Sequence, residues 1–423
     1  MSEAISVENQ KIPATEVLAK EGYKKTNLGW IPEGWNLTSL NKVSQIKGDY
    51  GINAAAVEFS PKLPTYLRIT DIDKDGNFLE DGKKSVDDSQ SGNFILKEGD
   101  VVFARTGASV GKTYFHHKKN GKLIFAGFLI RFRTKISLLL PKYLFYYTHS
   151  NLYWNWVKVN SMRSGQPGIN SKEYGNLPFP LPPLPEQQKI AAILSTWDNA
   201  IGKQEQLIAA KQHYKKGLMQ LLLTGKKRFD RFEGEWIESK LGNYCNVLMC
   251  KRIFNSETSE IGEIPFYKIG TVGKKPDAFI SRKLFQEYKE KYNYPRLHEI
   301  LITCSGTVGK CIPYNGEDAY FQDSNIVWID NPKNEIDNKF LYFLISTFDW
   351  DKLNSTTITR IYTNDLKSMR ISFPSFKEQQ KIASVLSKAD KEIALLQNQL
   401  TQLQTQKRGL MQKLLTGAVP VKI

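Results

Sequence analysis

The chain has 423 residues, of which 41% are hydrophobic and 12% aromatic, and its formal net charge is +16 at pH 7. This composition predicts two or three ordinary folded domains and argues against a disordered chain. No apolar run approaches the ~18–20 residues that span a bilayer, and the first ten residues do not resemble a signal peptide. The four cysteines lack the spacing of a zinc site. We therefore expect a cytoplasmic, metal-free protein with reduced thiols. The positive charge favours a polyanionic partner, although a merely lysine-rich surface would give the same total.

In chain order, the sequence divides into a tail, two domains and two long helices. Residues 1–26 are polar and read as a tail. Residues 27–180 and 226–374 carry short strand-like runs between turns, which predicts two globular domains of mixed α/β structure. Residues 181–225 and 375–423 carry sustained helical patterns, and each pattern ends in Thr-Gly, the dipeptide that supplies a terminating glycine.

The two long helices are copies of one another. LPEQQKIAAIL, from Leu184, returns as FKEQQKIASVL, from Phe376, and GLMQLLLTG, from Gly217, returns as GLMQKLLTG, from Gly409. In both copies apolar residues alternate by four and three, which is the heptad pattern of a coiled coil. We therefore expect an α+β protein whose two helices pair antiparallel as a spacer, with one domain at each end in a pseudo-two-fold arrangement.

The spacer seam is predicted to consist of the apolar heptad positions of both copies. These are Ile190, Leu194, Trp197, Ile201, Ile208, Leu218 and Leu222 in the first helix, and Ile382, Leu386, Ile393, Leu396, Leu400, Leu403, Leu410 and Leu414 in the second.

The two domains also share faint similarities. Each has a strand-like run, TYLRITDI from Thr65 and PFYKIGTV from Pro265. Each then has a strand that ends in a glycine turn, DVVFARTGASVGK from Asp100 and EILITCSGTVGK from Glu299. The chain therefore reads as domain, helix, domain, helix, in which the domains have diverged and the helices have not.

Together these motifs resemble the specificity subunit of type I restriction–modification enzymes. The resemblance rests on PLPPLPEQQKIAAIL and GLMQLLLTG with their second copies, on YLRITDI and on the two glycine turns, and it extends from about residue 27 to the end. It implies a non-catalytic DNA-recognition subunit with two target recognition domains, each reading one half of an asymmetric, split duplex. It further implies that two methyltransferase subunits dock on the helices and that restriction motor-nuclease subunits join them. S-adenosylmethionine, ATP and Mg are then expected in those partners, with no cofactor in this chain and no membrane contact.

The stretch TGASVGKT, Thr106–Thr113, looks like a phosphate-binding P-loop but differs from it in length. Three residues separate Gly107 from Gly111 where a P-loop has four, and the second copy, SGTVGKC, has two and lacks the Ser/Thr. Because a P-loop cradles phosphates with a fixed set of backbone N–H groups, this difference favours a turn over a nucleotide site. An NTPase remains the alternative from the class of enzymes, and a coiled-coil scaffold with incidental charge is the alternative from the class of structural proteins.

The predicted DNA contacts lie in the two turns, on the matched strands and in the loops before each long helix, because small and cationic groups approach phosphates and base edges well. They are Arg68, Arg105, Ser109, Lys112, Arg163 and Gln166 in the first domain, and Lys268, Ser305, Thr307, Lys310, Thr357 and Arg360 in the second. A structural turn or a solvated strand charge is the competing interpretation at each position. No methylation motif or H-E-x-x-H pair is present, and His116-His117 reads as surface.

Overall fold

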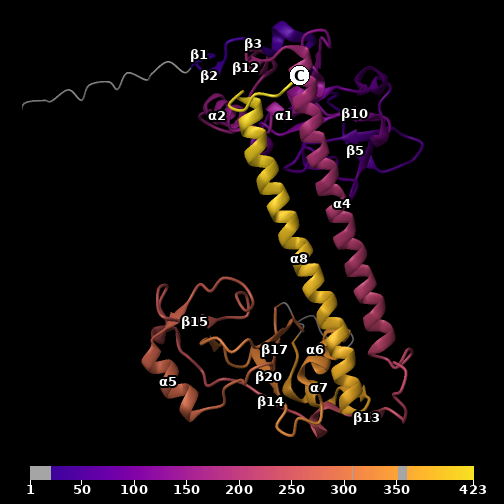
Figure 1. The fold of residues 1–423 in the computed structure, drawn as a ribbon, viewed down its shortest axis with the longest axis vertical. Helices are drawn as coiled ribbons and strands as arrows, with labels where there is room; N and C mark the ends of the chain where they lie inside the picture. The colour runs from indigo at the N-terminus through magenta and orange to yellow at the C-terminus, as the bar shows by residue number, and fades with distance from the viewer. Residues whose placement is uncertain (1–20, 307, 351–359) are drawn as a thin grey trace, which may run out of the picture. The chain divides into compact units, whose positions relative to one another are not determined.

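The computed structural model describes residues 21–306, 308–350 and 360–423. The chain splits into two compact units. Unit 1 comprises Met1–Lys203 with Leu400–Ile423, and unit 2 comprises Gln204–Gln399. Both units mix strands with short helices, and each contains half of both long helices, so the predicted α+β class is confirmed (Figure 1).

Unit 1 is built around a sheet of strand order β4-β11-β8-β9 and a second sheet of order β10-β6-β7-β5. All four residues of β8 are buried, which explains why this strand reads as a continuous apolar run. The strands of unit 1 are β1 (Tyr23–Thr26), β2 (Gly29–Pro32), β3 (Asn36–Ser39), β4 (Ser44–Tyr50), β5 (Ala56–Glu58), β6 (Thr65–Leu67), β7 (Lys84–Val86), β8 (Val101–Ala104), β9 (Thr113–Phe115), β10 (Leu123–Phe125), β11 (Leu129–Thr134) and β12 (Pro178–Leu181). Its short helices are α1 (Pro141–Tyr147), α2 (Asn151–Asn160) and α3 (Ser171–Gly175).

Unit 2 repeats this topology with other residues. Its sheet order β14-β20-β17-β18 corresponds to β4-β11-β8-β9, and its parallel pair β15–β19 corresponds to β6–β10. The strands of unit 2 are β13 (Ile237–Lys240), β14 (Asn246–Leu248), β15 (Ile264–Tyr267), β16 (Phe279–Ile280), β17 (Ile300–Thr303), β18 (Cys311–Pro313), β19 (Tyr320–Phe321), β20 (Ile326–Asp330) and β21 (Arg370–Phe373). Its short helices are α5 (Arg282–Lys291), α6 (Asn338–Ser346) and α7 (Thr363–Ser368).

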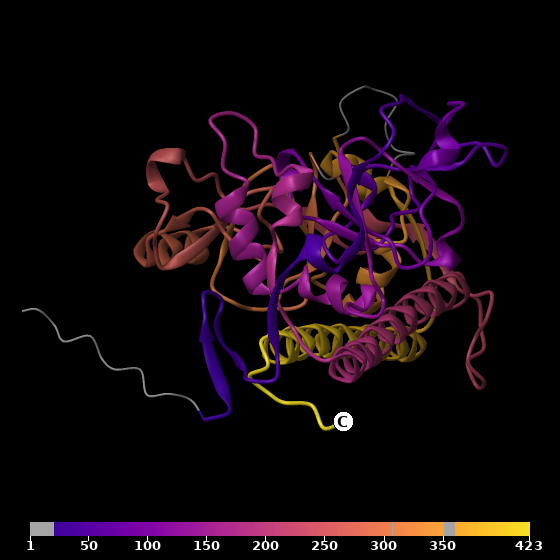
Figure 2. The same cartoon turned by 90° about the horizontal axis from the view of Figure 1, so that it is seen from above.

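The two long helices are α4 (Leu184–Leu222) and α8 (Phe376–Leu415). Within each unit, half of α4 lies beside half of α8 (Figures 1 and 2). In unit 2, Lys211 pairs with Glu392 and Lys215 with Asp390, so residue numbers rise on one helix as they fall on the other. The predicted antiparallel pairing is therefore confirmed inside unit 2. In unit 1 the matching pair is Lys407 with Asp198. All predicted seam residues are buried or half-buried.

The repeated EQQ motif fastens the start of each long helix to its own domain. Gln187 is buried and accepts a hydrogen bond from the Leu140 backbone N–H at 2.8 Å. Gln379 is buried too and accepts one from the Asp337 N–H at 2.7 Å. Both amides also donate to the carbonyl five residues before them, that of Pro182 or Pro374. The motif is thus repeated because the same joint between helix and domain is built twice.

Three local expectations need correction. The predicted tail lies outside the described residues up to 20, but Tyr23–Thr26 forms β1 and pairs with β2. His116 is not on the surface, because its side chain is buried beside Tyr114. The Ser375-x-x-Glu378 pattern at the start of α8 predicts a capping box, yet the buried Glu378 carboxylate accepts two hydrogen bonds from Arg228.

Candidate nucleic-acid interface

In unit 1, three segments distant in sequence meet where β8 ends. The Arg105 N–H donates to the Phe128 carbonyl at 3.0 Å, and the Arg105 carbonyl accepts from the Ile169 N–H at 2.9 Å. These bonds join the glycine turn 105–112, the loop 126–128 between β10 and β11, and the segment 161–170 before α3. We call this set of three segments edge 1. It brings together the two stretches of the first domain that the sequence singled out.

The glycine turn of edge 1 is shaped by packing and not by a bound nucleotide. Gly107 and Gly111 have φ of 67° and 88°, and a Cβ on Gly111 would lie 2.7 Å from Val157 of α2. The N–H groups of Gly107, Val110, Gly111 and Lys112 all donate to protein acceptors. A P-loop would direct such groups at phosphates, so this turn lacks the donors for that chemistry.

Edge 1 presents a cation, an amide and an exposed ring. The Arg105 guanidinium lies 4.8 Å from the centre of the Tyr50 ring, and the Phe128 side chain is 56% exposed. Gln166 is exposed, and its amide nitrogen lies only 2.9 Å from the place a Cβ on Gly107 would take. Ser109 is half-buried on the same turn. These groups can hydrogen-bond to base edges and contact them through apolar surface.

Unit 2 builds the same scaffold, which we call edge 2. It comprises residues 304–306 and 308–310 of the turn, the loop 322–325 and the segment 360–362. The Cys304 N–H donates to the Asn325 carbonyl at 2.8 Å, and the Cys304 carbonyl accepts from the Ile361 N–H at 2.9 Å. These are the counterparts of the two bonds of Arg105. Gly309 again has a positive φ, 77°, and a Cβ there would lie 2.2 Å from Trp350.

The side chains of edge 2 differ from those of edge 1. The Ser305 hydroxyl donates to the Asn325 side-chain oxygen at 2.9 Å. Arg360 donates to the Ser324 carbonyl at 3.4 Å, and its guanidinium lies 5.8 Å from the centre of the Tyr362 ring. Edge 2 is therefore polar at the position where edge 1 has an exposed phenyl ring.

Other predicted contacts are already engaged within the protein. Lys112 donates to the Ile72 carbonyl at 3.4 Å, and Lys310 donates to the equivalent Val272 carbonyl at 2.8 Å. Arg163 pairs with Glu173 at 2.5 Å, although it is exposed.

The two predicted strand cations also have carboxylate partners. Arg68 forms two hydrogen bonds to the buried Asp71, and Lys268 pairs with Asp277 at 2.9 Å. Neither side chain is free to point into a groove without breaking its pair. Thr307 and Thr357 lie outside the described residues.

Sequence reasoning missed Tyr50, Phe128 and Asn325. None lies in a motif, and each reaches its edge through strand pairing or a long-range backbone bond. The one available signal was the bulky, apolar Phe128 beside Gly127, between two strand-like runs.

Neither the thiols nor the histidines offer a metal site in the described part of the chain. Burial raises the pKa of Cys245, Cys250 and Cys311 to about 12, as expected of thiols that pack in a core. Burial also lowers the pKa of His116. Within residues 21–306, 308–350 and 360–423, no group of three or more His, Cys, Asp or Glu side chains could hold a metal ion. Over the same residues, no helix has the length and apolarity to cross a membrane.

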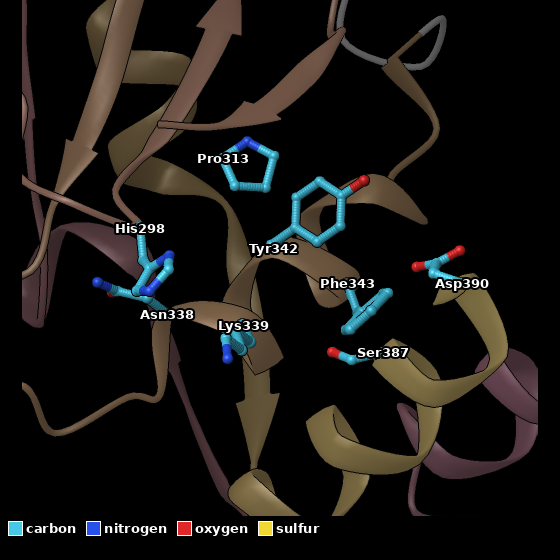
Figure 3. A pocket seen from close by; sticks show the side chains of 8 residues that line it. All are labelled: His298, Pro313, Asn338, Lys339, Tyr342, Phe343, Ser387 and Asp390. Carbon is cyan, nitrogen blue, oxygen red and sulfur yellow. The ribbon is translucent and has the colours of Figure 1, made fainter. Parts of the chain in front are cut away.

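A pocket of unit 2 lies between α6 and α8 (Figure 3). Its volume is about 190 Å³, which is below the ~300–1,000 Å³ typical of ligand sites. His298 and Pro313 line it at the end of β17 and β18 opposite to edge 2. Asp390 also lines it, but its carboxylate is paired with Lys215 at 2.5 Å. The pocket therefore belongs to the joint between helix and domain.

Two domains of mixed α/β structure carry matched loop edges and share the paired helices, an arrangement suited to contacting two separate half-sites of a nucleic acid. The chain belongs to the family whose model is described as the type I restriction modification DNA specificity domain, which matches residues 32–210 and 233–405. It is a non-catalytic specificity subunit that recognises DNA through these two domains.

Relatives agree with this assignment. A Haemophilus influenzae protein provisionally named a type I restriction enzyme specificity subunit is 41% identical over 219 residues. The match covers 50% of this chain and 55% of that protein, so this chain spans about half the length of that relative. The Methanocaldococcus jannaschii protein provisionally named the MjaX specificity subunit is 27% identical over 433 residues, 95% of this chain and 98% of that protein. A solved structure described under complex assembly and conformational transition of the type I R-M system shares the fold. Its TM-score is 0.57 at 19% identity, over 92% of this chain and 99% of that chain.

Proposed function

We propose that edge 1 and edge 2 each read one half of a split, asymmetric duplex, and that α4 and α8 set the spacer between the halves. The observation that supports this most is that one backbone scaffold carries different side chains in the two units. Equivalent scaffolds would approach equivalent positions on DNA, while different side chains would select different bases. The net charge of +16 would supply phosphate attraction without sequence preference.

The repeated helices support two equivalent docking surfaces for methyltransferase subunits. Because the two long helices are near copies, a partner that binds one could bind the other. Restriction motor-nuclease subunits would then complete the complex. S-adenosylmethionine, ATP and Mg would be bound by these partners and not by this chain, as the resemblance implies.

Methylation mapping tests the proposal. Cells that carry this chain and its methyltransferase partner should methylate adenines in one motif of two unlike halves separated by unspecified bases. A duplex with that motif should bind the full chain more tightly than a scrambled duplex, and affinity should fall steeply as salt rises. A continuous motif would contradict reading by two separate edges, and equal binding to both duplexes at physiological salt would favour the scaffold alternative.

A further inference from the structure

Residue 128 in unit 1 and residue 325 in unit 2 occupy the same place in their edges. The carbonyl of each accepts the N–H of the first residue after the central buried strand, Arg105 after β8 and Cys304 after β17. Each residue also directly precedes the strand that pairs with that central strand, β11 in unit 1 and β20 in unit 2. The two positions therefore have the same backbone environment. A sequence comparison would not pair them, because the side chains of Phe and Asn differ in size and polarity.

Hydrogen bonds hold the backbone on both sides of Phe128, while its ring is exposed to solvent. The Gly127 N–H donates to the Ile52 carbonyl at 2.8 Å, and the Leu129 N–H donates to the Ala126 carbonyl at 2.8 Å. More than half of the phenyl side chain is exposed, and it has no polar atom. An exposed ring on a backbone held in this way can contact a thymine methyl group or a base face, but it cannot make a hydrogen bond.

At the matching position, Asn325 is oriented for hydrogen bonding. Its side-chain oxygen accepts from the Ser305 hydroxyl at 2.9 Å, which fixes the amide and leaves its NH₂ group as a donor. Arg360, on the neighbouring segment of the same edge, adds further donors. Amide and guanidinium donors match the N7 and O6 acceptors of purines in the major groove.

We propose that residues 128 and 325 are the equivalent specificity-determining positions of the two domains, Phe128 reading its half-site through apolar contact and Asn325 through hydrogen bonds to a purine, with Ser305 as a positioning residue. This inference rests on the proposed function, because it assigns particular base-reading groups to edges 1 and 2.

Three duplexes test the assignment, used with the full chain bound to its methyltransferase partner. One carries the mapped motif, and each of the others has one half scrambled. The wild type should penalise both scrambled duplexes. Phe128→Ala should reduce the penalty for one half at least about fivefold, and Asn325→Ala should do the same for the other half only. Ile136→Ala, a change at an exposed residue beyond the end of β11 opposite to edge 1, is the control and should keep both penalties.

A second arm tests the chemistry of each contact. Replacing the thymines of the half affected by Phe128→Ala with deoxyuridine removes their methyl groups, and it should weaken binding of the wild type but not of that variant. Ser305→Ala should lower discrimination at the same half as Asn325→Ala, and Ser305→Thr, which keeps the hydroxyl, should restore it.

The outcomes separate the two levels of the proposal. If the wild type penalises neither scrambled duplex, the proposed function itself fails. If the wild type discriminates and both alanine variants keep both penalties, the assignment of these positions is overturned. It is also overturned if both variants affect the same half, or if either variant affects both halves equally.

Discussion

At the scale of residues, both units contain the same cluster of a lysine, an aspartate and an aromatic ring. In unit 1, Lys407 pairs with Asp198 and lies 5.7 Å from the centre of the Tyr146 ring. In unit 2, Lys215 pairs with Asp390 and lies 5.3 Å from the centre of the Phe343 ring. Only the first cluster includes a phenol, and the Tyr146 hydroxyl donates to Asp198 at 2.6 Å.

This difference predicts unequal costs for one substitution. Asp198→Ala removes the carboxylate acceptor of a largely buried phenol, whose hydroxyl then keeps only the longer contact of 3.1 Å to Ser195, and it should lower the free energy of unfolding by about 1–3 kcal/mol. Asp390→Ala leaves no phenol unpaired and removes a half-exposed ion pair, so it should cost about 0–1 kcal/mol. Thermal melting of the full-length variants measures both. Equal shifts in melting temperature would show that the phenol contributes nothing.

The buried His116 predicts a dependence of stability on pH. Burial lowers its pKa in the folded chain, while Asp100 and Glu98 oppose the shift. Its contribution to stability is therefore fully present above the unfolded pKa, about 6.5, and is lost as pH falls through the lower pKa of the folded state. His116→Gln should lose less stability than the wild type between pH 7.5 and 5.5 in urea titrations. An unchanged pH difference would contradict this, and His213→Gln on an exposed face of α4 is the control.

At the scale of elements, each domain core is completed by the end of a long helix. Met411, Leu414 and Leu415 of α8 pack into the core of unit 1, while Leu222 of α4 and the adjacent Leu223 pack into the core of unit 2. The glycine after each helix lies close to rings of its own unit. A Cβ on Gly417 would lie 2.3 Å from Pro32 and 3.4 Å from Trp35, and a Cβ on Gly225 would lie 3.2 Å from Trp236. The LLTG ending is thus repeated because it fills the same place twice.

Core completion by the helix ends predicts that the two units can be destabilised separately. Leu414→Ala should lower the stability of unit 1 by about 2–5 kcal/mol, because it leaves a cavity in a closed core. Leu222→Ala should do the same to unit 2. Hydrogen exchange at β8 and β17 reports the two units independently, so each variant should accelerate exchange in its own unit. Acceleration in the other unit, or in neither, would contradict this.

The long helices could be predicted closely from sequence, whereas the edges could not. The heptad pattern, the prolines before Gln187 and the glycines at 225 and 417 are local signals, and the observed helices begin and end within a few residues of them. Edge 1 depends on bonds such as that from Arg105 to Phe128, which join segments that no local pattern connects. Sequence therefore located the glycine turns but not the residues that lie opposite them.

At the scale of the whole molecule, the chain contains two similar units, and each unit includes part of both long helices. The start of α4 and the end of α8 belong to unit 1, while the end of α4 and the start of α8 belong to unit 2. The internal repeat is visible in these contacts, because equivalent residues such as Asp198 and Asp390 bind equivalent lysines, Lys407 and Lys215. The bases that each edge selects could not be predicted, because they depend on side chains placed by tertiary contacts.

The spacer between half-sites tests the proposed role of the helices most directly. Deleting Ile201–Leu207 from α4 and Gln397–Leu403 from α8 removes one heptad from each helix and keeps the pairs Asp198–Lys407 and Lys211–Glu392. Seven residues at 1.5 Å each shorten both helices by about 10 Å, the rise of roughly three base pairs. Methylation mapping with the shortened chain should give the same two half-sites with about three fewer bases between them. Methylation of the original motif with its spacer unchanged would contradict the proposal that α4 and α8 set the distance between the half-sites.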